Sequence, residues 1–228
     1  MRFILIILFI AIGIVNIFLF QDWFLWGVDN GLSWTISSLL GWGIALISAI
    51  ITLILILKSN LKSKAVKWIF GLVILAGVLT GTFAKNKIYT SDYTKESTEL
   101  TFETHPIAEQ LERKKANFEG LVLIARAGCP FCKQAIEERL VTLKKRNPEL
   151  DVAVYMAQGN ETDLEPYKSE RTKDILFVAK DSVWPEGSTI SISGFPTFVY
   201  AKNGTITHLW SNNDFGFGAL DWVENKLN

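Results

Sequence analysis

The stretch Gly128-Cys129-Pro130-Phe131-Cys132 decides the fold of this 228-residue chain, because it holds both of its cysteines, separated by two residues. A continuously apolar run, 121–125, comes directly before it, and a helical pattern over 131–146 follows it. A cysteine pair between a strand and a helix is typical of a redox-active dithiol. So short a loop restricts the unfolded chain very little, so chemistry explains the pair better than stability does.

Working outward from the cysteines, apolar periodicity and turn residues predict alternating strands and helices over the last 130 or so residues. The run 121–125 suits a central strand that is buried on both faces. The expected order is a short strand within 98–104, a helix from His105-Pro106 to Phe118, the strand 121–125, the helix 131–146, a strand at 151–156, mixed loop and helix at 159–172, an undecided segment at 175–179, hairpin strands at 197–201 and 205–210, and a closing helix over 217–227. This order predicts a mixed α/β sheet.

The hairpin carries a second motif. Phe195-Pro196-Thr197 stands directly before its first strand, and Lys202-Asn203-Gly204 is a turn signal between the two strands. A proline at 196 has no N–H to donate, which leaves neighbouring backbone groups free for an extended peptide. The alternative is an ordinary turn proline at the start of a strand.

The order of elements, the Cys-Pro-Phe-Cys at a strand-to-helix junction and the Phe-Pro-Thr before a hairpin strand resemble the thioredoxin superfamily. The resemblance covers residues 98–228. It implies a thioredoxin-like fold, a cis-proline at Pro196 that faces the dithiol, and a substrate-binding segment formed by Phe195, Pro196 and Thr197. Two family features are absent, because Leu123 stands where a buried acid is common and Gly128 where a tryptophan is common.

The chemistry of the pair follows from thiolate reactivity. Cys129 would stand at the start of a helix, where free N–H groups favour negative charge, and Pro130 fits the first helical position. We therefore expect Cys129 to attack a partner disulfide and Cys132 to resolve the mixed disulfide, or the reverse with an active-site disulfide that is donated. Arg126 and Lys133 are candidates for stabilising the thiolate, although each also fits a solvated surface charge.

Other chemistries fit less well. A structural zinc site needs four ligands, and His105 and His208 are far apart in the sequence, so we expect no metal. Thiol–disulfide exchange itself needs no cofactor. The pair Cys129 and Cys132 also resembles the dithiol of glutaredoxins, but the double glycine of that family is missing, which argues against dependence on glutathione.

The first third of the chain predicts a membrane anchor, residues 1–84, followed by a polar tether at 85–97. Apolar runs at 3–20, 34–57 and 66–84 are each long enough to cross a hydrocarbon core of about 30 Å. The first run could instead be a cleaved signal peptide, but small residues of a cleavage site are lacking where it ends. Apart from Lys67 at the start of the third run, these spans contain no Asp, Glu, Lys, Arg or His, which favours anchoring over transport.

Lysines predict the orientation. The loop between the second and third spans carries Lys58, Lys62, Lys64 and Lys67, which the positive-inside rule assigns to the cytoplasm together with the N-terminus. An odd number of spans then carries residues 98–228 across the plasma (inner) membrane to the periplasmic or extracellular side. Disulfides persist there.

The sequence therefore predicts a membrane-tethered thiol–disulfide oxidoreductase. Its expected partners are protein thiols or disulfides outside the cytoplasm, a redox partner that recycles the dithiol, and the lipid bilayer. The balance of 23 basic and 23 acidic residues gives no sign of a nucleic-acid partner. The alternative is a thioredoxin-like binding module of a membrane complex with little or no redox turnover.

Overall fold

The structure is a computed structural model, and it describes residues 2–59, 63–85, 98–99, 105–181 and 194–226. The chain divides into two compact units, Met1–Thr90 and Ser91–Asn228. We call the first the helical unit and the second the sheet unit. The tether was predicted at 85–97, but Lys85 is the last residue of α3. The rest of the tether (86–97), most of the strand predicted at 98–104, and Leu227 of the closing helix lie outside the described residues.

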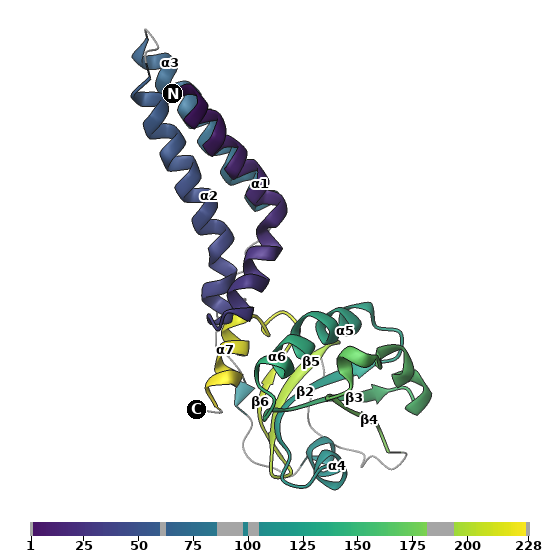
Figure 1. Cartoon of the computed structure of the whole chain (residues 1–228). Coiled ribbons are helices and arrows are strands. Elements are labelled where there is room, and N and C mark those ends of the chain that lie inside the picture. The colour runs from purple at the N-terminus through teal and green to yellow at the C-terminus, as the bar shows by residue number, and fades with distance from the viewer. Residues whose placement is uncertain (1, 60–62, 86–97, 100–104, 182–193, 227–228) are drawn as a thin grey trace. The chain divides into compact units, whose positions relative to one another are not determined.

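The helical unit consists of α1 (Arg2–Asp29), α2 (Trp34–Leu57) and α3 (Lys64–Lys85) (Figure 1). All three are long and apolar enough to cross a membrane, over Ile4–Asp29, Trp34–Leu57 and Lys64–Ala84. This indicates a membrane protein and agrees with the three predicted spans. The second span has the predicted bounds, and the third begins two residues early.

The first span is longer than the predicted 3–20, because α1 continues through Gln21 and Asp22 to Asp29. Two polar residues interrupt an apolar run, but they do not break a helix, since neither is Gly or Pro. The helix ends where Gly31 takes a left-handed φ of +82°, and the Ser33 hydroxyl then caps α2 by accepting from the Ile36 N–H at 3.2 Å.

Helices α1 and α2 approach closely at small residues. A Cβ on Gly41 would lie 2.3 Å from a ring carbon of Phe20, so only glycine leaves room for this ring. Beside it, the buried Asn16 side chain donates from Nδ2 to the Gly41 carbonyl at 2.9 Å. Close packing and this hydrogen bond therefore help to join the two helices.

The sheet unit is built on six strands in the order β1-β6-β5-β2-β3-β4. Strands β2, β3 and β4 run parallel, while β5 pairs antiparallel with β2 and with β6, and β6 with β1. The strands are β1 (Thr98–Glu99), β2 (Glu119–Arg126), β3 (Asp151–Gln158), β4 (Leu176–Ala179), β5 (Thr197–Lys202) and β6 (Thr205–Trp210). A mixed sheet with helices agrees with the α/β class predicted from the sequence.

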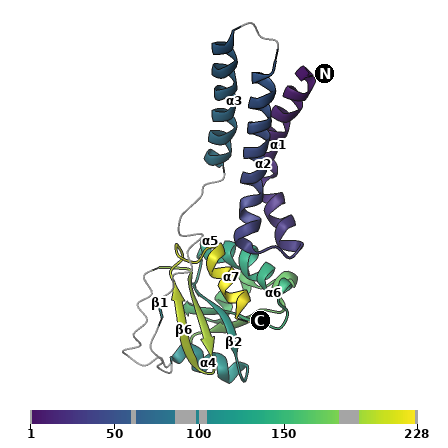
Figure 2. The same cartoon turned by 90° about the vertical axis from the view of Figure 1, so that its left-hand side faces the viewer.

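Helices cover both faces of this sheet (Figure 2). They are α4 (Pro106–Lys114), α5 (Pro130–Ala135), α6 (Val141–Arg146) and α7 (Phe217–Asn225), with a π-helical turn η2 (Ile136–Leu140) and the 3-10 helices η3 (Glu161–Tyr167) and η4 (Glu170–Thr172). On one face, Ile107 and Leu111 of α4 join a buried cluster with Val122 of β2 and Tyr155 of β3. Helices α5, α6 and α7 lie on the other face.

The central strand β2 has the predicted character, since all residues from Gly120 to Ala125 are buried between β3 and β5. The hairpin prediction is also confirmed. Strand β6 has the predicted bounds, and the turn residues Asn203 and Gly204 both take positive φ, +50° and +75°. Such φ values match the right-handed twist of the paired strands. The undecided segment 175–179 forms β4, which pairs with β3.

Two local predictions are corrected. Phe118 lies after α4 rather than on it, because α4 ends at Lys114, yet the Phe118 side chain is 2% exposed and packs in the same cluster as Ile107 and Leu111. The helix predicted over 131–146 contains the π-helical turn Ile136–Leu140. The apolar spacing is that of a continuous helix, so the sequence carries no signal for this turn.

Candidate functional site

The two cysteines lie where the turn after β2 enters α5, with Cys129 just before the helix and Cys132 in its first turn. Gly128 takes a left-handed φ of +66°, which explains why this position is glycine, and Cys129 follows as the N-cap of α5. The backbone N–H of Cys132 donates to Cys129 Sγ at 3.1 Å, and Pro130 occupies the first turn. Cys129 and Cys132 form a disulfide, with their Cα atoms 5.3 Å apart.

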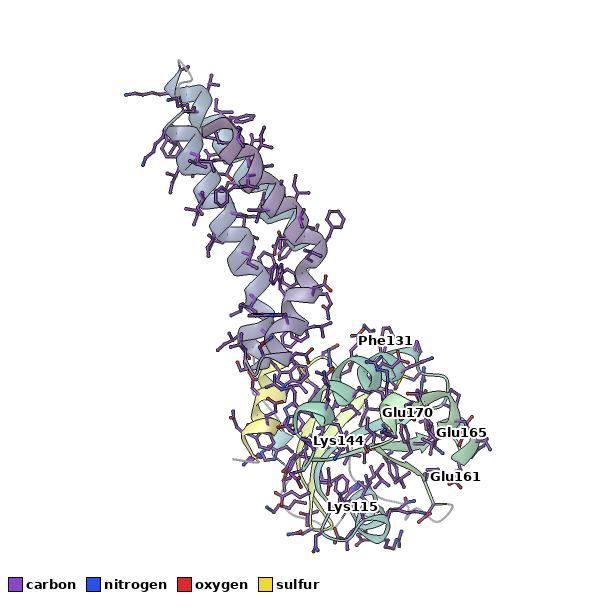
Figure 3. The ribbon with its side chains drawn as sticks, viewed as in Figure 1. Lys115, Phe131, Lys144, Glu161, Glu165 and Glu170 are labelled. Atoms are coloured by element: carbon purple, nitrogen blue, oxygen red, sulfur yellow. A yellow bond between two sulfur atoms is a disulfide. The ribbon has the colours of Figure 1, made fainter. Side chains whose placement is uncertain are left out.

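The cysteines differ in exposure. Cys129 is 4% exposed and borders an open pocket, whereas Cys132 is 0% exposed on the inner side of the helix. Of the two cysteines, Cys129 is therefore the one that a partner can reach first, and the fully buried Cys132 is closed to it. Between them Phe131 is 63% exposed, and among the described residues of the sheet unit no other large apolar side chain is as open (Figure 3).

The segment Phe195-Pro196-Thr197 lies at the same end of the sheet as the cysteine turn, where β2 ends and β5 begins. Thr197 begins β5 and pairs with Ile124 of β2. Pro196, one residue earlier, therefore lies alongside the last residues of β2, just before the turn. The Phe195–Pro196 peptide bond is cis, and Pro196 is buried. The Thr197 hydroxyl donates to the Gly194 carbonyl at 2.7 Å, which fixes the segment before the strand.

Arg126 is exposed at the end of β2, and its guanidinium carbon lies 5.9 Å from the centre of the Phe195 ring. This distance is within the range of a cation–π contact. The Arg126 carbonyl accepts from the Tyr167 hydroxyl at 3.1 Å, and the next residue, Ala127, donates its N–H to the Gln158 carbonyl at 2.8 Å. The end of β2 is thus tied to η3 and to the end of β3, which holds the cysteine turn in place.

An open pocket of about 230 Å³ lies between the cysteine turn and η3. One side is formed by Gly128, Cys129, Pro130 and Lys133, and the other by Asp163, Pro166 and Tyr167. Lys133 lies 3.9 Å from Glu137 one turn further along, and both side chains are more than half exposed. The residues at 195–197 do not line this pocket.

The segment after β3 forms the far wall of the pocket because η3 begins with a capping box. The Asn160 side chain accepts from the Thr162 N–H at 2.9 Å, and the Asp163 carboxylate accepts from the Asn160 N–H at 2.8 Å. Gly159 has a φ of +132°, and a Cβ there would lie 2.9 Å from Asp163 Oδ2 and 3.2 Å from the Ala127 side chain. Glycine at 159 therefore lets η3 fold back against the cysteine turn.

Sequence reasoning missed Asp163, Pro166 and Tyr167. The pattern Asn160-x-x-Asp163 was a usable signal, because it marks the start of a helix. No sequence signal could show that this helix returns to the cysteines. The position where the family places a buried acid holds Leu123, which is 0% exposed. Among the described residues, no three His, Cys, Asp or Glu side chains gather as a metal site would require.

Comparisons with known proteins returned no match to any family model, curated protein or solved structure. The function of this protein therefore has to follow from its own side chains. Three features bear on it: the Cys129–Cys132 pair, the Phe195–Pro196 segment at the same end of the sheet, and the pocket between the cysteine turn and η3.

Proposed function

We propose that this protein is a membrane-tethered thiol–disulfide oxidoreductase whose sheet unit has a thioredoxin-like fold. The observation that carries the proposal is the Cys129–Cys132 disulfide at the start of α5, with only Cys129 bordering an open pocket. A purely structural disulfide would add little stability across so short a loop. The proposed fold is supported by the sequence of β2, the cysteine turn and helix, β3, and then the β5–β6 hairpin and α7.

In the reduced form, Cys129 is the attacking residue. The Cys132 N–H that points at Cys129 Sγ stabilises a thiolate there, since a hydrogen bond to the charged form favours ionisation. The Cys129 thiolate attacks one sulfur of a partner disulfide, and the other partner sulfur leaves as a thiolate with the electron pair. Cys132 then loses its proton to water and attacks Cys129 Sγ, which closes the pair and releases the second partner sulfur.

The reverse direction uses the same atoms. A partner thiolate attacks Cys129 Sγ of the disulfide, and Cys132 leaves as a thiolate inside the domain. A second partner thiolate then attacks the mixed disulfide, so the partner gains the disulfide and Cys129 and Cys132 gain two electrons. Which direction dominates depends on the reduction potential of the pair relative to its partners.

Phe195, Pro196 and Thr197 are proposed to hold the substrate chain beside Cys129. Their position at the end of the sheet where β2 ends supports this role. Because Pro196 has no N–H, a substrate backbone lying along this segment would bond to its neighbours as an added strand does. The exposed Phe131 ring would meet the partner on the way in.

The proposed location follows from the lysines at 58, 62, 64 and 67, which belong in the cytoplasm by the positive-inside rule. The sheet unit then lies outside the cytoplasm, where its partners are proteins with thiols or disulfides and a protein that recycles the dithiol. Protease added to intact spheroplasts should cleave the sheet unit but spare the lysine loop. Protection of the sheet unit would reverse the orientation.

The deciding experiment is a redox titration of the full chain in lipid nanodiscs, equilibrated with glutathione buffers of known poise. We expect one reversible two-electron couple that disappears in Cys129→Ser. A potential of about −120 mV would make the protein an oxidant, and one of about −270 mV a reductant. No reversible couple at all would refute the oxidoreductase and leave a binding module.

A trapping experiment tests the assigned roles. Cys132→Ala removes the resolving thiol, so mixed disulfides through Cys129 should accumulate in membranes and run as larger species without reductant. The matched control is Cys129→Ala, which retains Cys132 and should trap nothing because Cys132 is fully buried. Equal trapping by both variants would contradict the order of attack.

A further inference from the structure

The pocket beside Cys129 has the size of one long side chain. Its volume of about 230 Å³ is below the roughly 300 Å³ at which pockets for free small ligands begin. It equals the space of about seven or eight water molecules at ~30 Å³ each. A residue that neighbours the reacting cysteine of a partner would be brought to this pocket whenever that cysteine reaches Cys129.

Apolar residues contribute much of the pocket lining, namely Pro130, Pro166 and Tyr167. The Tyr167 hydroxyl donates to the Arg126 carbonyl, so its proton is already engaged within the protein. Such a lining favours the hydrocarbon part of an entering side chain.

The charges at the rim favour a cation. Asp163 lines the pocket and makes no ion pair with any described residue, and its carboxylate accepts from the Asn160 N–H. On the opposite wall, Lys133 has Glu137 at 3.9 Å to offset its charge. Glu161, at the start of η3, adds a further exposed carboxylate to the same segment (Figure 3).

We propose that this pocket binds a basic side chain, Arg or Lys, next to the reacting cysteine of the partner, with Asp163 as the residue that recognises its charge. An arginine or lysine has a long apolar stem for the rings and a charged head for the carboxylate. The inference rests on the proposed function, because the pocket borders Cys129. It adds a substrate preference that the exchange reaction by itself does not require.

The test uses three peptides that are identical except for the residue beside their single cysteine, which is Arg, norleucine or Glu. Each cysteine is joined by a disulfide to thionitrobenzoate, and the full chain in nanodiscs is reduced beforehand. The Cys129 thiolate attacks the peptide sulfur, the peptide–thionitrobenzoate bond breaks, and thionitrobenzoate leaves as a coloured thiolate with the electron pair. Because the pocket can receive a residue from either side, the variable residue is placed before and after the cysteine in separate sets.

In the unmodified protein, we expect the second-order rate constant for the Arg peptide to exceed that for norleucine by about fivefold in one set, with Glu slowest. The preference should weaken as salt is raised. Asp163→Asn keeps an oxygen for the Asn160 N–H but loses the charge, so Arg and norleucine should then react at equal rates. The matched control is Glu165→Gln on the same 3-10 helix, whose carboxylate pairs with Lys168 and lies outside the pocket lining, and it should keep the preference.

The outcomes separate this inference from the proposed function. If all three peptides react at one rate in both sets, or if Asp163→Asn keeps the Arg preference, the pocket does not recognise a basic side chain, although exchange itself stands. If no peptide releases thionitrobenzoate faster with the unmodified protein than with Cys129→Ser, the oxidoreductase fails and this preference fails with it.

Discussion

The helical unit and the sheet unit make their polar contacts over different distances along the chain. In the helical unit, the Ser48 and Thr82 hydroxyls donate to carbonyls three and four residues earlier in their own helices. In the sheet unit, Gln110 and Arg146 bond to groups 69 and 78 positions away. A helix in lipid must satisfy its backbone within itself, whereas a sheet depends on segments far apart in the sequence. Substitutions at long-range contacts should therefore lower the stability of the sheet unit much more than that of the helical unit.

The largest effect is expected at Gly120, where β2 lies directly beside Asp151 of β3. A Cβ on this residue would lie 1.8 Å from the Asp151 carbonyl oxygen, which is backbone and cannot move aside without parting the strands. Gly120→Ala should lower the free energy of unfolding of the sheet unit by more than about 4 kcal/mol. Urea titration followed by pulse proteolysis of the full chain in nanodiscs measures this.

The matched control for that variant is Gly194→Ala, because a Cβ on Gly194 would meet nothing within 4 Å. This control should stay within about 0.5 kcal/mol of the unmodified protein. If Gly120→Ala were as mild as its control, the close pairing of β2 with β3 at this point would be wrong.

The next largest effect is expected at Glu224 on α7. Its carboxylate bonds to Arg146 at 2.8 and 2.9 Å and accepts from Asn147 Nδ2 at 2.7 Å, and both members of the ion pair are mostly buried. Glu224→Ala leaves the guanidinium without this carboxylate and should cost about 3 kcal/mol. The same urea and proteolysis measurement reports it.

An exposed ion pair of equal length provides the comparison. Glu165 and Lys168 are also 2.8 Å apart, but they are three residues apart in the sequence and largely open to solvent. Glu165→Ala should cost less than about 1 kcal/mol. Equal losses of unfolding free energy at Glu224 and Glu165 would mean that burial and sequence separation do not decide how much an ion pair stabilises this unit.

The same distinction explains what the sequence predicted. Three apolar runs, the Asn203-Gly204 turn and the cysteine spacing are local signals, and the helices, the hairpin and the disulfide agree with them. The first helix extends beyond the predicted run 3–20, because Gln21 and Asp22 end the apolar run without breaking the helix. The pocket was missed because Asp163 meets Cys129 only after β3 and η3 have folded back.

A smaller effect, which depends on pH, is expected at His105. This buried residue caps α4, with Nδ1 accepting from the Ile107 N–H at 3.2 Å, and burial lowers its pKa from the ordinary value of 6.5. As pH falls through 6.5, the unfolded chain therefore takes up this proton before the folded chain does, and stability is lost. Above this range both states hold a neutral ring, and the residue contributes no pH dependence.

His105→Asn keeps a capping oxygen and removes the titration. Between pH 7.5 and 5.5, the sheet unit of the unmodified protein should lose about 1 kcal/mol relative to this variant. Urea midpoints for both proteins at several pH values give the difference, in which every other titrating group cancels. A difference that stays constant with pH would show that His105 is not held neutral by the fold.

The smallest effect is expected in the helical unit, at the hydrogen bond from Asn16 to the Gly41 carbonyl. This bond spans 25 residues, so it is the helical counterpart of the long-range contacts in the sheet unit. Hydrogen bonds between membrane helices are worth about 0.6 kcal/mol on average. The Asn16 Oδ1 atom is buried with no partner among the described residues, and Asn16→Leu removes that cost together with the bond. The net loss should therefore be below about 0.6 kcal/mol, measured as the opening free energy of α1 amides by hydrogen exchange in nanodiscs.

Ser48→Ala, which removes a bond within one helix, is the control. A loss of stability at Asn16 as large as that expected at Glu224 would contradict the difference between the two units, because long-range polar bonds would then stabilise both units equally.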